Sequence, residues 1–404
     1  MGNTPKLRFE GFTDAWEQRK LGEFVTFFSG LTYSPKDIRP SGTLVLRSSN
    51  VKDGEVVDAD NVYVDPGVVN SENVQDGDII VVVRNGSRAL IGKHAEIKGF
   101  KPNTVIGAFM TGIRSEHSSF VNALLNTPRF DSEVAMNMGA TINQITGYMF
   151  SKMEFLIPDP KEQDAIGDSF RQLDSLITFH QRKCDVLTKA KSFYLQNLFP
   201  QEGRKEPKLR LEGFTGAWDQ YTLGDLYTER NERGNETLQI LTVSIHTGVS
   251  DGALEEDELG KSVRRSEDKT LYKHVYAGDL IFNMMRAWQG AIGVAKREGM
   301  ISPAYISAIP NEKVYPPFMN YLLRRKEIIS QINNLSYGVT DFRKRLYWDS
   351  FIKVKCCLPS VEEQKRITDV FEQLDTLITR QKRKVEALKT MKKFMLQNMF
   401  PQEG

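Results

Sequence analysis

The chain has 404 residues, 40% of them hydrophobic and 26% charged, with a formal net charge of +2. This length exceeds what one hydrophobic core supports, so we expect two or three domains, and the ordinary composition excludes a disordered or collagen-like chain. Because no apolar run approaches the roughly 18 residues of a membrane span, and the first residues lack the apolar core of a signal peptide, we expect a cytoplasmic protein. The weak net charge means that nucleic-acid binding would require clustered cations or cations shared with partner subunits.

An N-terminal arm, residues 1–20, opens the chain, and its sequence returns near the middle. Pro5–Phe24 reads PKLRFEGFTDAWEQRKLGEF and Pro207–Leu226 reads PKLRLEGFTGAWDQYTLGDL. The second copy begins within a short, charged linker, residues 201–222. We expect Trp16 and Trp218 to pack each arm onto its domain, since a buried indole contributes more often to packing than to ligand binding.

Each arm is followed by a body with both strand and helix signals; the two bodies are residues 21–157 and 223–358. Short β-branched runs are broken by glycine, and helical segments follow near 119–138 and 317–335. The stretches Gly77–Gly92 and Gly278–Gly293 share the pattern Gly-Asp-(Ile/Leu)-Ile followed by an Arg and an Ile-Gly. The sequence therefore predicts two α+β bodies that share a fold under divergent surfaces.

A long helix ends each half, in residues 158–200 and 359–404. Asp159 with Glu162, and Ser360 with Glu363, predict capping boxes at the two helix starts. Apolar residues recur at steps of three and four, which is typical of a coiled-coil seam; a polar residue, His180 or Gln381, interrupts each seam. We expect the helices to pair antiparallel with each other through Phe170, Leu173, Ile177, Leu187, Phe371, Leu374, Ile378 and Leu388.

The chain is thus predicted to be a tandem duplication of about 200 residues with pseudo-two-fold symmetry, each unit running arm, body, helix. A helix of about 35 residues is roughly 50 Å long, which suits a rigid spacer between two bodies. Divergent bodies on a repeated frame indicate two different ligands read at a fixed separation.

Signatures of catalysis are missing from the sequence. The stretch Gly86–Lys93 resembles a phosphate loop but has five intervening residues, and His94 stands where Ser or Thr would bind magnesium. The five histidines include no His-x-x-x-His pair, and the three cysteines include no Cys-x-x-Cys, so we expect buried thiols and no metal site. No nucleophile elbow or dinucleotide fingerprint is present. We therefore expect no catalytic residue in this chain.

Basic and amide side chains in the bodies fit a nucleic-acid ligand, because arginine pairs with guanine and asparagine or glutamine with adenine in the major groove. The candidates are Arg47, Ser48, Asn50, Arg84, Asn85, Arg88, Lys93, Asn143 and Gln144 in the first body, and Ser244, His246, Arg286, Trp288, Gln289, Arg343, Lys344 and Arg345 in the second. The second body also carries Arg264, Arg265, Arg324 and Arg325. For each residue alone, a solvated surface charge or a loop cap is the alternative interpretation.

In these features the whole chain resembles the specificity subunits of type I restriction-modification systems. The residues that carry the resemblance are the paired Pro-Lys-Leu-Arg-x-Glu-Gly-Phe-Thr arms, the segments LRSSNVKDGEV and GDIIVVVRNGS of the first body, RAWQGAIGV and ISPAYI of the second, and the Glu-Gln pairs at 162–163 and 363–364. The combination is specific to that family, although each piece alone is weak.

The resemblance implies two target-recognition domains, residues 21–157 and 223–358, that each read one half of a split asymmetric DNA site, with paired helices setting the spacer. It implies two adenine methyltransferase subunits docked on the helices and restriction subunits that translocate and cleave DNA. S-adenosylmethionine, ATP and Mg²⁺ would then belong to the partners, and this chain would hold no cofactor.

Two other functions remain open at this stage. One is a coiled-coil scaffold whose bodies bind proteins and not DNA, against which the basic loops argue. The other is a self-contained nuclease or methyltransferase, which the missing motifs disfavour. Salt-dependent DNA retention and activity of the isolated chain with S-adenosylmethionine would discriminate among the three.

Overall fold

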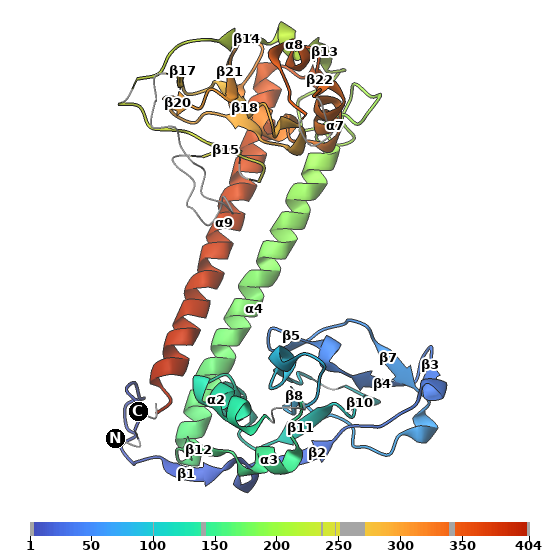
Figure 1. Ribbon diagram of the computed structural model, residues 1–404. Helices are drawn as coiled ribbons and strands as arrows, with labels where there is room; N and C mark the ends of the chain where they lie inside the picture. The colour runs from blue at the N-terminus through green and yellow to red at the C-terminus, as the bar shows by residue number, and fades with distance from the viewer. Residues whose placement is uncertain are drawn as a thin grey trace. The chain divides into compact units, whose positions relative to one another are not determined.

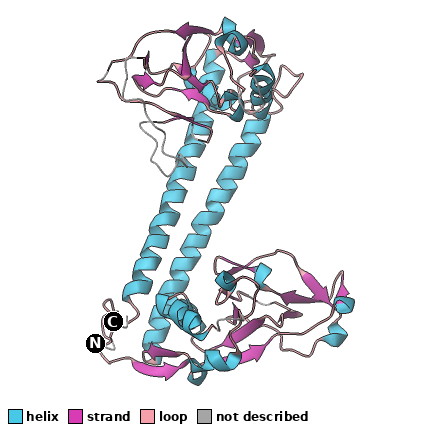
Figure 2. Cartoon of the chain, in the orientation of Figure 1, coloured by secondary structure: helices cyan, strands magenta, loops and turns pink. Residues whose placement is uncertain are grey.

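The structure is a computed structural model that describes residues 4–99, 101–138, 143–235, 237–246, 248–250, 271–338 and 344–401. It divides into two compact units, residues 1–182 with 382–404, and residues 183–381. Arg264, Arg265 and Arg343 lie outside the described residues. Both units combine short strands and short helices with part of two long helices (Figures 1 and 2).

The first unit contains two four-stranded sheets. One, entirely antiparallel, has the order β2-β11-β8-β9, and the other has the order β10-β4-β7-β3, in which β10 and β4 are parallel. Two strand pairs, β1-β12 and β5-β6, complete the strands. Their bounds are β1 Glu17–Lys20, β2 Thr26–Ser29, β3 Ile38–Arg39, β4 Thr43–Leu46, β5 Val51–Lys52, β6 Glu55–Val56, β7 Val62–Val64, β8 Ile79–Val82, β9 His94–Glu96, β10 Thr104–Ile106, β11 Met110–Arg114 and β12 Glu154–Ile157.

Short helices cover the first sheet and lead to the long helix α4. The α-helices are α1 Ser118–Leu125, α2 Pro128–Asn137, α3 Gly147–Lys152 and α4 Pro160–Asn197, and the 3-10 turns are η1 Leu21–Glu23, η2 Pro35–Asp37, η3 Ser48–Asn50, η4 Pro66–Val68 and η5 Arg88–Leu90. Strand β8 is buried at all four positions, and its residues belong to one hydrophobic core with Phe120 of α1 and Phe130 of α2. This buried strand positions the polar loop that follows it.

The second unit repeats the antiparallel sheet and the strand pair beside the long helix, whereas its other described strands form the pairs β15-β16 and β17-β20 and not a second four-stranded sheet. Its sheet β14-β21-β18-β19 has the order and antiparallel pairing of β2-β11-β8-β9, and β13-β22 repeats β1-β12. The strands are β13 Asp219–Thr222, β14 Tyr227–Arg230, β15 Val243–Ser244, β16 Gly248–Val249, β17 Lys273–Val275, β18 Leu280–Asn283, β19 Ile292–Val294, β20 Gly299–Ile301, β21 Tyr305–Pro310 and β22 Lys355–Leu358. The helices are α6 Pro316–Leu322, α7 Lys326–Leu335, α8 Trp348–Phe351 and α9 Val361–Asn398, with turns η6 Leu223–Asp225 and η7 Ala287–Gln289. The repeat in sequence is therefore a repeat in topology, and the predicted α+β class is confirmed.

The helices α4 and α9 pair antiparallel within each unit. In the first unit Phe170 and Leu173 are buried, and Lys392 Nζ donates to Asp174 Oδ1 at 2.6 Å. In the second, the Cys184 thiol contacts the carbonyl oxygen of Ile378 at 3.7 Å. The remaining seam residues differ in burial: Phe371 and Ile378 are buried, and Ile177, Leu187, Leu374 and Leu388 are half-buried. In this part of the chain the polar seam residue Gln381 is also buried, whereas His180 is half-buried.

Each arm is fixed to the start of a long helix by a buried carboxylate. Glu162 accepts two hydrogen bonds from Arg8 and one from Trp16 Nε1, and Glu363 accepts two from Arg210. The predicted N-cap bonds are present: Asp159 Oδ1 accepts from the amide of Glu162 and Ser360 Oγ from the amide of Glu363, both at 3.3 Å. The glutamate side chains, which would complete reciprocal capping boxes, accept instead from the arm arginines.

The aromatic arm residues pack as expected. The Trp16 ring lies 5.9 Å from Phe400, and the Trp218 ring lies 6.0 Å from Phe199, at equivalent places of the two units. Both indoles are 1% exposed. Among the described residues, no helix is long and apolar enough to cross a membrane.

Candidate nucleic-acid interface

The loop after β8 in the first unit meets two other segments at the end of the sheet. The amide of Val83 donates to Phe109 O at 3.0 Å, and the amide of Ile145 donates to Val83 O at 2.9 Å. Three segments far apart in the sequence therefore converge where the buried strand ends.

Side chains of this loop cluster hold one another in place. Asn85 Nδ2 donates to Ser48 Oγ at 3.1 Å, and Asn143 Nδ2 donates to Gly86 O at 3.1 Å. Gln144 pairs with Arg84 in an isolated β-bridge. The amide groups are thus pre-positioned by contacts within the protein, which lowers the entropy lost when a ligand orders them.

Arg84 differs from its neighbours because it is fixed by an aromatic ring. Its guanidinium carbon lies 5.1 Å from the centroid of Phe109, which is 55% exposed. Within the described residues this guanidinium makes no hydrogen bond, so its donors are available to a ligand. Phe109 was not among the sequence candidates; its flanking residues, Gly-Ala before it and Met-Thr after it, carry no polar pattern that would have identified it.

Other candidates of the first body lie elsewhere or inside. Arg88 is exposed at the start of η5, and Lys93 is half-buried just before β9. Arg47 donates to Asp60 O. Asn50 is 0% exposed, and its Nδ2 donates to Ala59 O at 2.6 Å and to Asn61 Oδ1 at 3.0 Å. Asn50 therefore stabilises the turn of η3 and cannot reach a ligand without unfolding it.

The second unit builds the same convergence with different side chains. The amide of Met284 donates to Ala304 O at 3.3 Å, and the amide of Leu346 donates to Met284 O at 2.9 Å. Residues 284 and 346 stand 201 positions after 83 and 145, which is also the offset between Glu162 and Glu363. The two bodies therefore present equivalent loops on one frame.

The exposed residues of this second loop cluster include Arg286 and Gln289. Trp288 Nε1 donates to Met285 O at 2.9 Å, so the indole is fixed against the loop. Arg345 is exposed and its backbone pairs with Tyr337, which is 51% exposed, while Lys344 is half-buried.

The remaining candidates lie apart from the loop cluster around Arg286: Ser244 is the last residue of β15, and His246 lies in the loop after it. Ser244 Oγ accepts from the His246 amide at 3.1 Å, and the carbonyl groups of Ile245 and His246 accept from Arg324. The loop after β15 is therefore held by the turn that follows α6.

Two arginines of the bodies are neutralised beneath the sheets. Arg114 binds the buried Asp78 through two bonds of 2.8 Å, and Arg230 binds the buried Asp279 at 2.7 and 3.1 Å. The hydrogen bonds to Asp78 raise the pKa of Arg114. The aspartates occupy equivalent positions of the repeat, whereas the arginines come from different strands, so the ion pair is retained although its donor changes.

Groups suited to catalysis are scarce in the described part of the chain. There, no set of three or more His, Cys, Asp or Glu side chains could hold a metal ion. Burial raises the pKa of the Cys356 thiol to about 12, which makes it a poor nucleophile. The three cysteines are free thiols; Cys184 and Cys356 are buried as predicted, whereas Cys357 is half-buried.

Comparison with known proteins agrees with this geometry. Residues 13–189 match the family model of the type I restriction modification DNA specificity domain. The chain is 24% identical over 173 residues to the type I restriction enzyme EcoKI specificity subunit of Escherichia coli K12, and 23% identical over 279 residues to the MjaVIII specificity subunit of Methanocaldococcus jannaschii. These matches cover 41% and 63% of this chain. They span 36% of the EcoKI subunit and 63% of the MjaVIII subunit.

A solved structure shares the fold over nearly the full length. The crystal structure of a type I restriction-modification S subunit from M. genitalium superimposes with a TM-score of 0.66 at 15% identity, covering 99% of this chain and 100% of that one. The duplicated α+β bodies with their long helices therefore have the same fold as that S subunit. The family model matches less than half of the chain and the curated relatives are 22–24% identical to it, so the chain is similar to the specificity subunits of type I restriction-modification systems.

Proposed function

We propose that this chain is the DNA sequence-specificity subunit of a type I restriction-modification complex. Each body reads one half of a bipartite, asymmetric DNA site, the long helices set the spacer, and the complex acts in the cytoplasm. The observation that supports the proposal is that the two bodies form the loop cluster at equivalent positions but with different side chains. Arg84 and Asn85 in the first body correspond to Met285 and Arg286 in the second. Because the side chains at equivalent positions differ, the two bodies recognise different half-sites.

The chemistry of the two loop clusters supports base recognition. An arginine can donate two bonds to guanine, and an asparagine or glutamine side chain can both donate to and accept from adenine. In the first body the proposed contacts are Ser48, Arg84, Asn85, Arg88, Lys93, Asn143 and Gln144, to which we add Phe109. In the second they are Arg286, Trp288, Gln289, Arg343, Lys344 and Arg345, with Ser244 and His246 on the neighbouring loop.

The long helices support docking of partner subunits. Outside the buried seam they expose large apolar side chains: Leu176 and Phe394 in the first unit, and Leu377 and Phe193 in the second, between 41% and 56% exposed. Each pair stands at equivalent positions of the repeat. Exposed apolar stripes on a helix are typical of a helical partner. We propose that each unit binds one methyltransferase subunit, and that restriction subunits join this assembly.

The methylation and cleavage reactions would be catalysed by those partner subunits. S-adenosylmethionine, ATP and Mg²⁺ would bind there, and the target adenine would be flipped into the methyltransferase pocket. The absence of recognisable catalytic motifs in this sequence fits such a division of labour.

The proposal is tested by coexpressing the chain with a methyltransferase subunit and sequencing methyladenine in host DNA. One split motif, two short half-sites around a fixed gap, is the expected result. Arg84→Ala should relax recognition of the first half-site alone and Arg286→Ala of the second alone, each by about 1–3 kcal/mol of discrimination. Arg19→Ala, at an exposed arginine of the first unit outside the loop clusters, is the control.

The pattern of failure is informative. Weakening that is uniform across all sequences would make Arg84 or Arg286 a phosphate contact. A stable complex with the methyltransferase that neither methylates nor retains DNA would favour the protein-binding scaffold over a DNA reader.

A further inference from the structure

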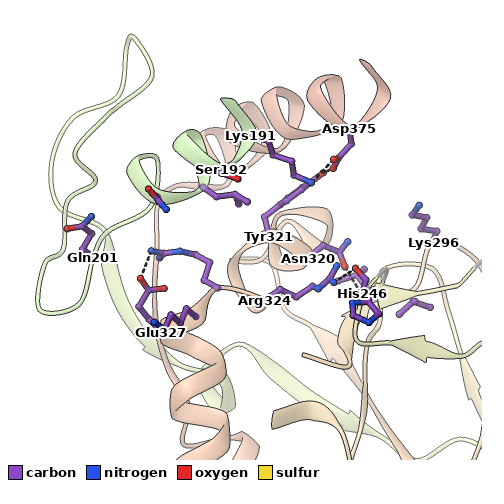
Figure 3. Close-up of a pocket in the computed structure, with 16 residues that line it drawn as sticks. Lys191, Ser192, Gln201, His246, Lys296, Asn320, Tyr321, Arg324, Glu327 and Asp375 are labelled. Atoms are coloured by element: carbon purple, nitrogen blue, oxygen red, sulfur yellow. Dashed lines mark hydrogen bonds and ion pairs between the residues drawn. The ribbon is translucent and has the colours of Figure 1, made fainter. Parts of the chain in front are cut away.

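A cleft of about 690 Å³ lies in the second unit, beside the loop of Ser244 and His246 (Figure 3). Its walls are the last turns of α4, the end of β19 and the turn between α6 and α7. Lysine and arginine side chains dominate its charged lining: Lys191, Lys296, Arg324, Arg325 and Lys326, against the carboxylates of Glu327 and Asp375.

Two of these five cations are already neutralised. Lys191 Nζ lies 2.5 Å from Asp375 Oδ1, and Arg325 lies 3.3 Å from Glu327 Oε1, as the dashed lines of Figure 3 show. Their charges balance the two carboxylates of the lining, so they contribute little to the affinity for an anion.

The other three cations have no carboxylate partner within the described residues. Lys296 and Lys326 are exposed and make no ion pair there. Arg324 is half-buried, and its Nη2 donates only to backbone carbonyl groups, those of Ile245 at 2.8 Å and of His246. Burial lowers the pKa of Arg324, which reflects the cost of a guanidinium without a counter-ion. The cleft therefore carries an excess of positive charge that an anion would compensate.

The first body lacks two of these three cations at the equivalent positions. The segment Phe120–Pro128 reads FVNALLNTP and Phe318–Lys326 reads FMNYLLRRK, so Asn126 and Pro128 stand where the second body has Arg324 and Lys326. Strand register pairs Ile79 with Glu96 and Leu280 with Val294, so Lys98 is the counterpart of Lys296, and Lys98 is neutralised by Glu55 at 2.6 Å. The excess of positive charge is thus a feature of the second body.

We propose that this cleft binds phosphate groups of the DNA backbone beside the half-site read by the second body. The proposal rests on the proposed DNA-reading function. His246, one of the proposed base readers, lines the cleft, and Arg324 holds its loop through two carbonyl groups. Cations on two separate segments, after β19 and between α6 and α7, suit successive phosphates of a strand, since phosphate contacts fix the register of a protein on DNA.

A free nucleotide fits the cleft less well than a DNA strand. The aromatic residue of the lining, Tyr321, already stacks on Phe371 with ring centroids 4.8 Å apart, and the Lys191 ammonium lies 5.5 Å from its centroid. Its ring therefore offers little face on which a base would stack, whereas backbone phosphates need only the cations.

The test measures how DNA affinity depends on salt for the double variant K296A/K326A. Each neutralised phosphate contributes about 0.9 to the slope of log K against log salt, so the variant should lose up to about 1.8 from that slope while the recognised sequence stays unchanged. The matched control is K208A/K353A, two exposed lysines of the same unit outside the cleft. The full chain, in complex with its methyltransferase partner, is titrated with a duplex carrying the selected site.

A second arm locates the phosphates. When neutral methylphosphonate linkages stand beside the second half-site, the slope for the unmodified protein should fall to the value that the double variant shows on unmodified DNA. The slope for the double variant should be the same on both DNAs. The same linkages beside the first half-site should affect both proteins equally.

The outcomes separate the cleft from the function. Sequence-specific DNA binding with the same slope in the double variant and in the control would overturn the cleft assignment and leave the DNA-reading function intact. Binding of ATP that the double variant loses, with an unchanged DNA slope, would assign the cleft to a free nucleotide. Failure of the unmodified complex to bind any duplex would overturn the DNA-reading function and this inference with it.

Discussion

Arg8 forms two hydrogen bonds of 2.7 Å with the carboxylate of Glu162, and the side chain of Glu162 is entirely buried. Arg210 and Glu363 repeat the pair at 2.9 and 2.8 Å in the second unit. A residue of the arm is thus joined to the first turn of a helix 154 positions away, and the same bond recurs in both copies. The pair fixes where each long helix starts relative to its own body.

Removing the arginine alone should be costly. Arg8→Ala leaves a buried carboxylate without its cation, so we expect a loss of about 3 kcal/mol in the free energy of unfolding of the first unit. The double variant R8A/E162Q should recover part of this loss because no buried charge remains. Arg19→Ala, which breaks an exposed pair with Glu23, should cost at most about 0.5 kcal/mol and serves as the control. Urea denaturation followed by hydrogen exchange in peptides of the first unit measures these losses. Equal losses of unfolding free energy for R8A and R19A would show that the buried Arg8–Glu162 pair stabilises the first unit no more than an exposed ion pair does.

His94 should make the first unit sensitive to acid. Its ring is buried, Nδ1 lies 3.0 Å from Gly92 O, and Nε2 lies 3.1 Å from Asn126 Nδ2, which fits a neutral imidazole that donates at Nδ1. Burial lowers the pKa of His94. Below the unfolded pKa of about 6.5 the unfolded chain therefore binds a proton that the folded chain refuses, and stability falls as the pH falls.

The variant H94Q separates this effect from general acid denaturation. Between pH 7.5 and pH 5.5 the free energy of unfolding of the first unit should fall more for the unmodified chain than for H94Q. His246→Gln, at an exposed histidine of the second unit, should leave the difference unchanged. An equal fall in the unmodified chain and in H94Q would show that His94 does not carry the pH dependence.

The exposed apolar residues of the long helices should control partner stoichiometry. Phe193→Ser and Phe394→Ser change side chains that are 54% and 56% exposed, so the fold should remain intact. Each single variant should bind one methyltransferase subunit and the double variant none, as native mass spectrometry of the complex would report. Lys393→Ser, beside Phe394 and also exposed, should retain both partners. Two partners on the double variant would exclude this surface as the docking site.

The helices are expected to act as the ruler of the DNA site. Inserting four residues after Lys189 and four after Thr390 adds about one turn, or roughly 6 Å, to both helices. At 3.4 Å per base pair the gap between half-sites should lengthen by about two base pairs, with both half-sites unchanged. Methyladenine sequencing reads the gap and the half-sites together. Four residues added after Glu202, in the linker, should leave the gap as it was; altered half-sites would contradict the ruler.

The repeats made the architecture predictable. Because the arm, the Gly-Asp-(Ile/Leu)-Ile pattern and the helix each occur twice, the sequence predicted two α+β bodies of one topology, and the structure builds sheet β2-β11-β8-β9 again as β14-β21-β18-β19. Helix α4 begins at Pro160, where the sequence placed proline at the first helical position. Hydrophobic periodicity and helix-end signals depend on residues that are close together in the chain, so a single sequence is enough to recognise them.

Long-range contacts were the part that local patterns did not reveal. Glu162 has the spacing of a capping box, but its partner is Arg8 in the arm. Asn50 follows three polar residues and looks like a surface loop, yet its amide closes a turn over Ala59 and Asn61. The cations of the cleft come from positions as far apart as Lys296 and Lys326, which only the folded chain brings to one place.

The backbone amide of Leu7 donates to Asn398 O at 2.8 Å, and that of Leu209 donates to Asn197 O at 2.9 Å. In each unit, therefore, an arm meets the last turn of a long helix in the same way, although one of these junctions is a covalent linker and the other is not. Each arm is therefore docked by its own contacts with the end of a long helix, so the six residues between Pro200 and Pro207 carry chain connectivity and are not what holds the second arm in place.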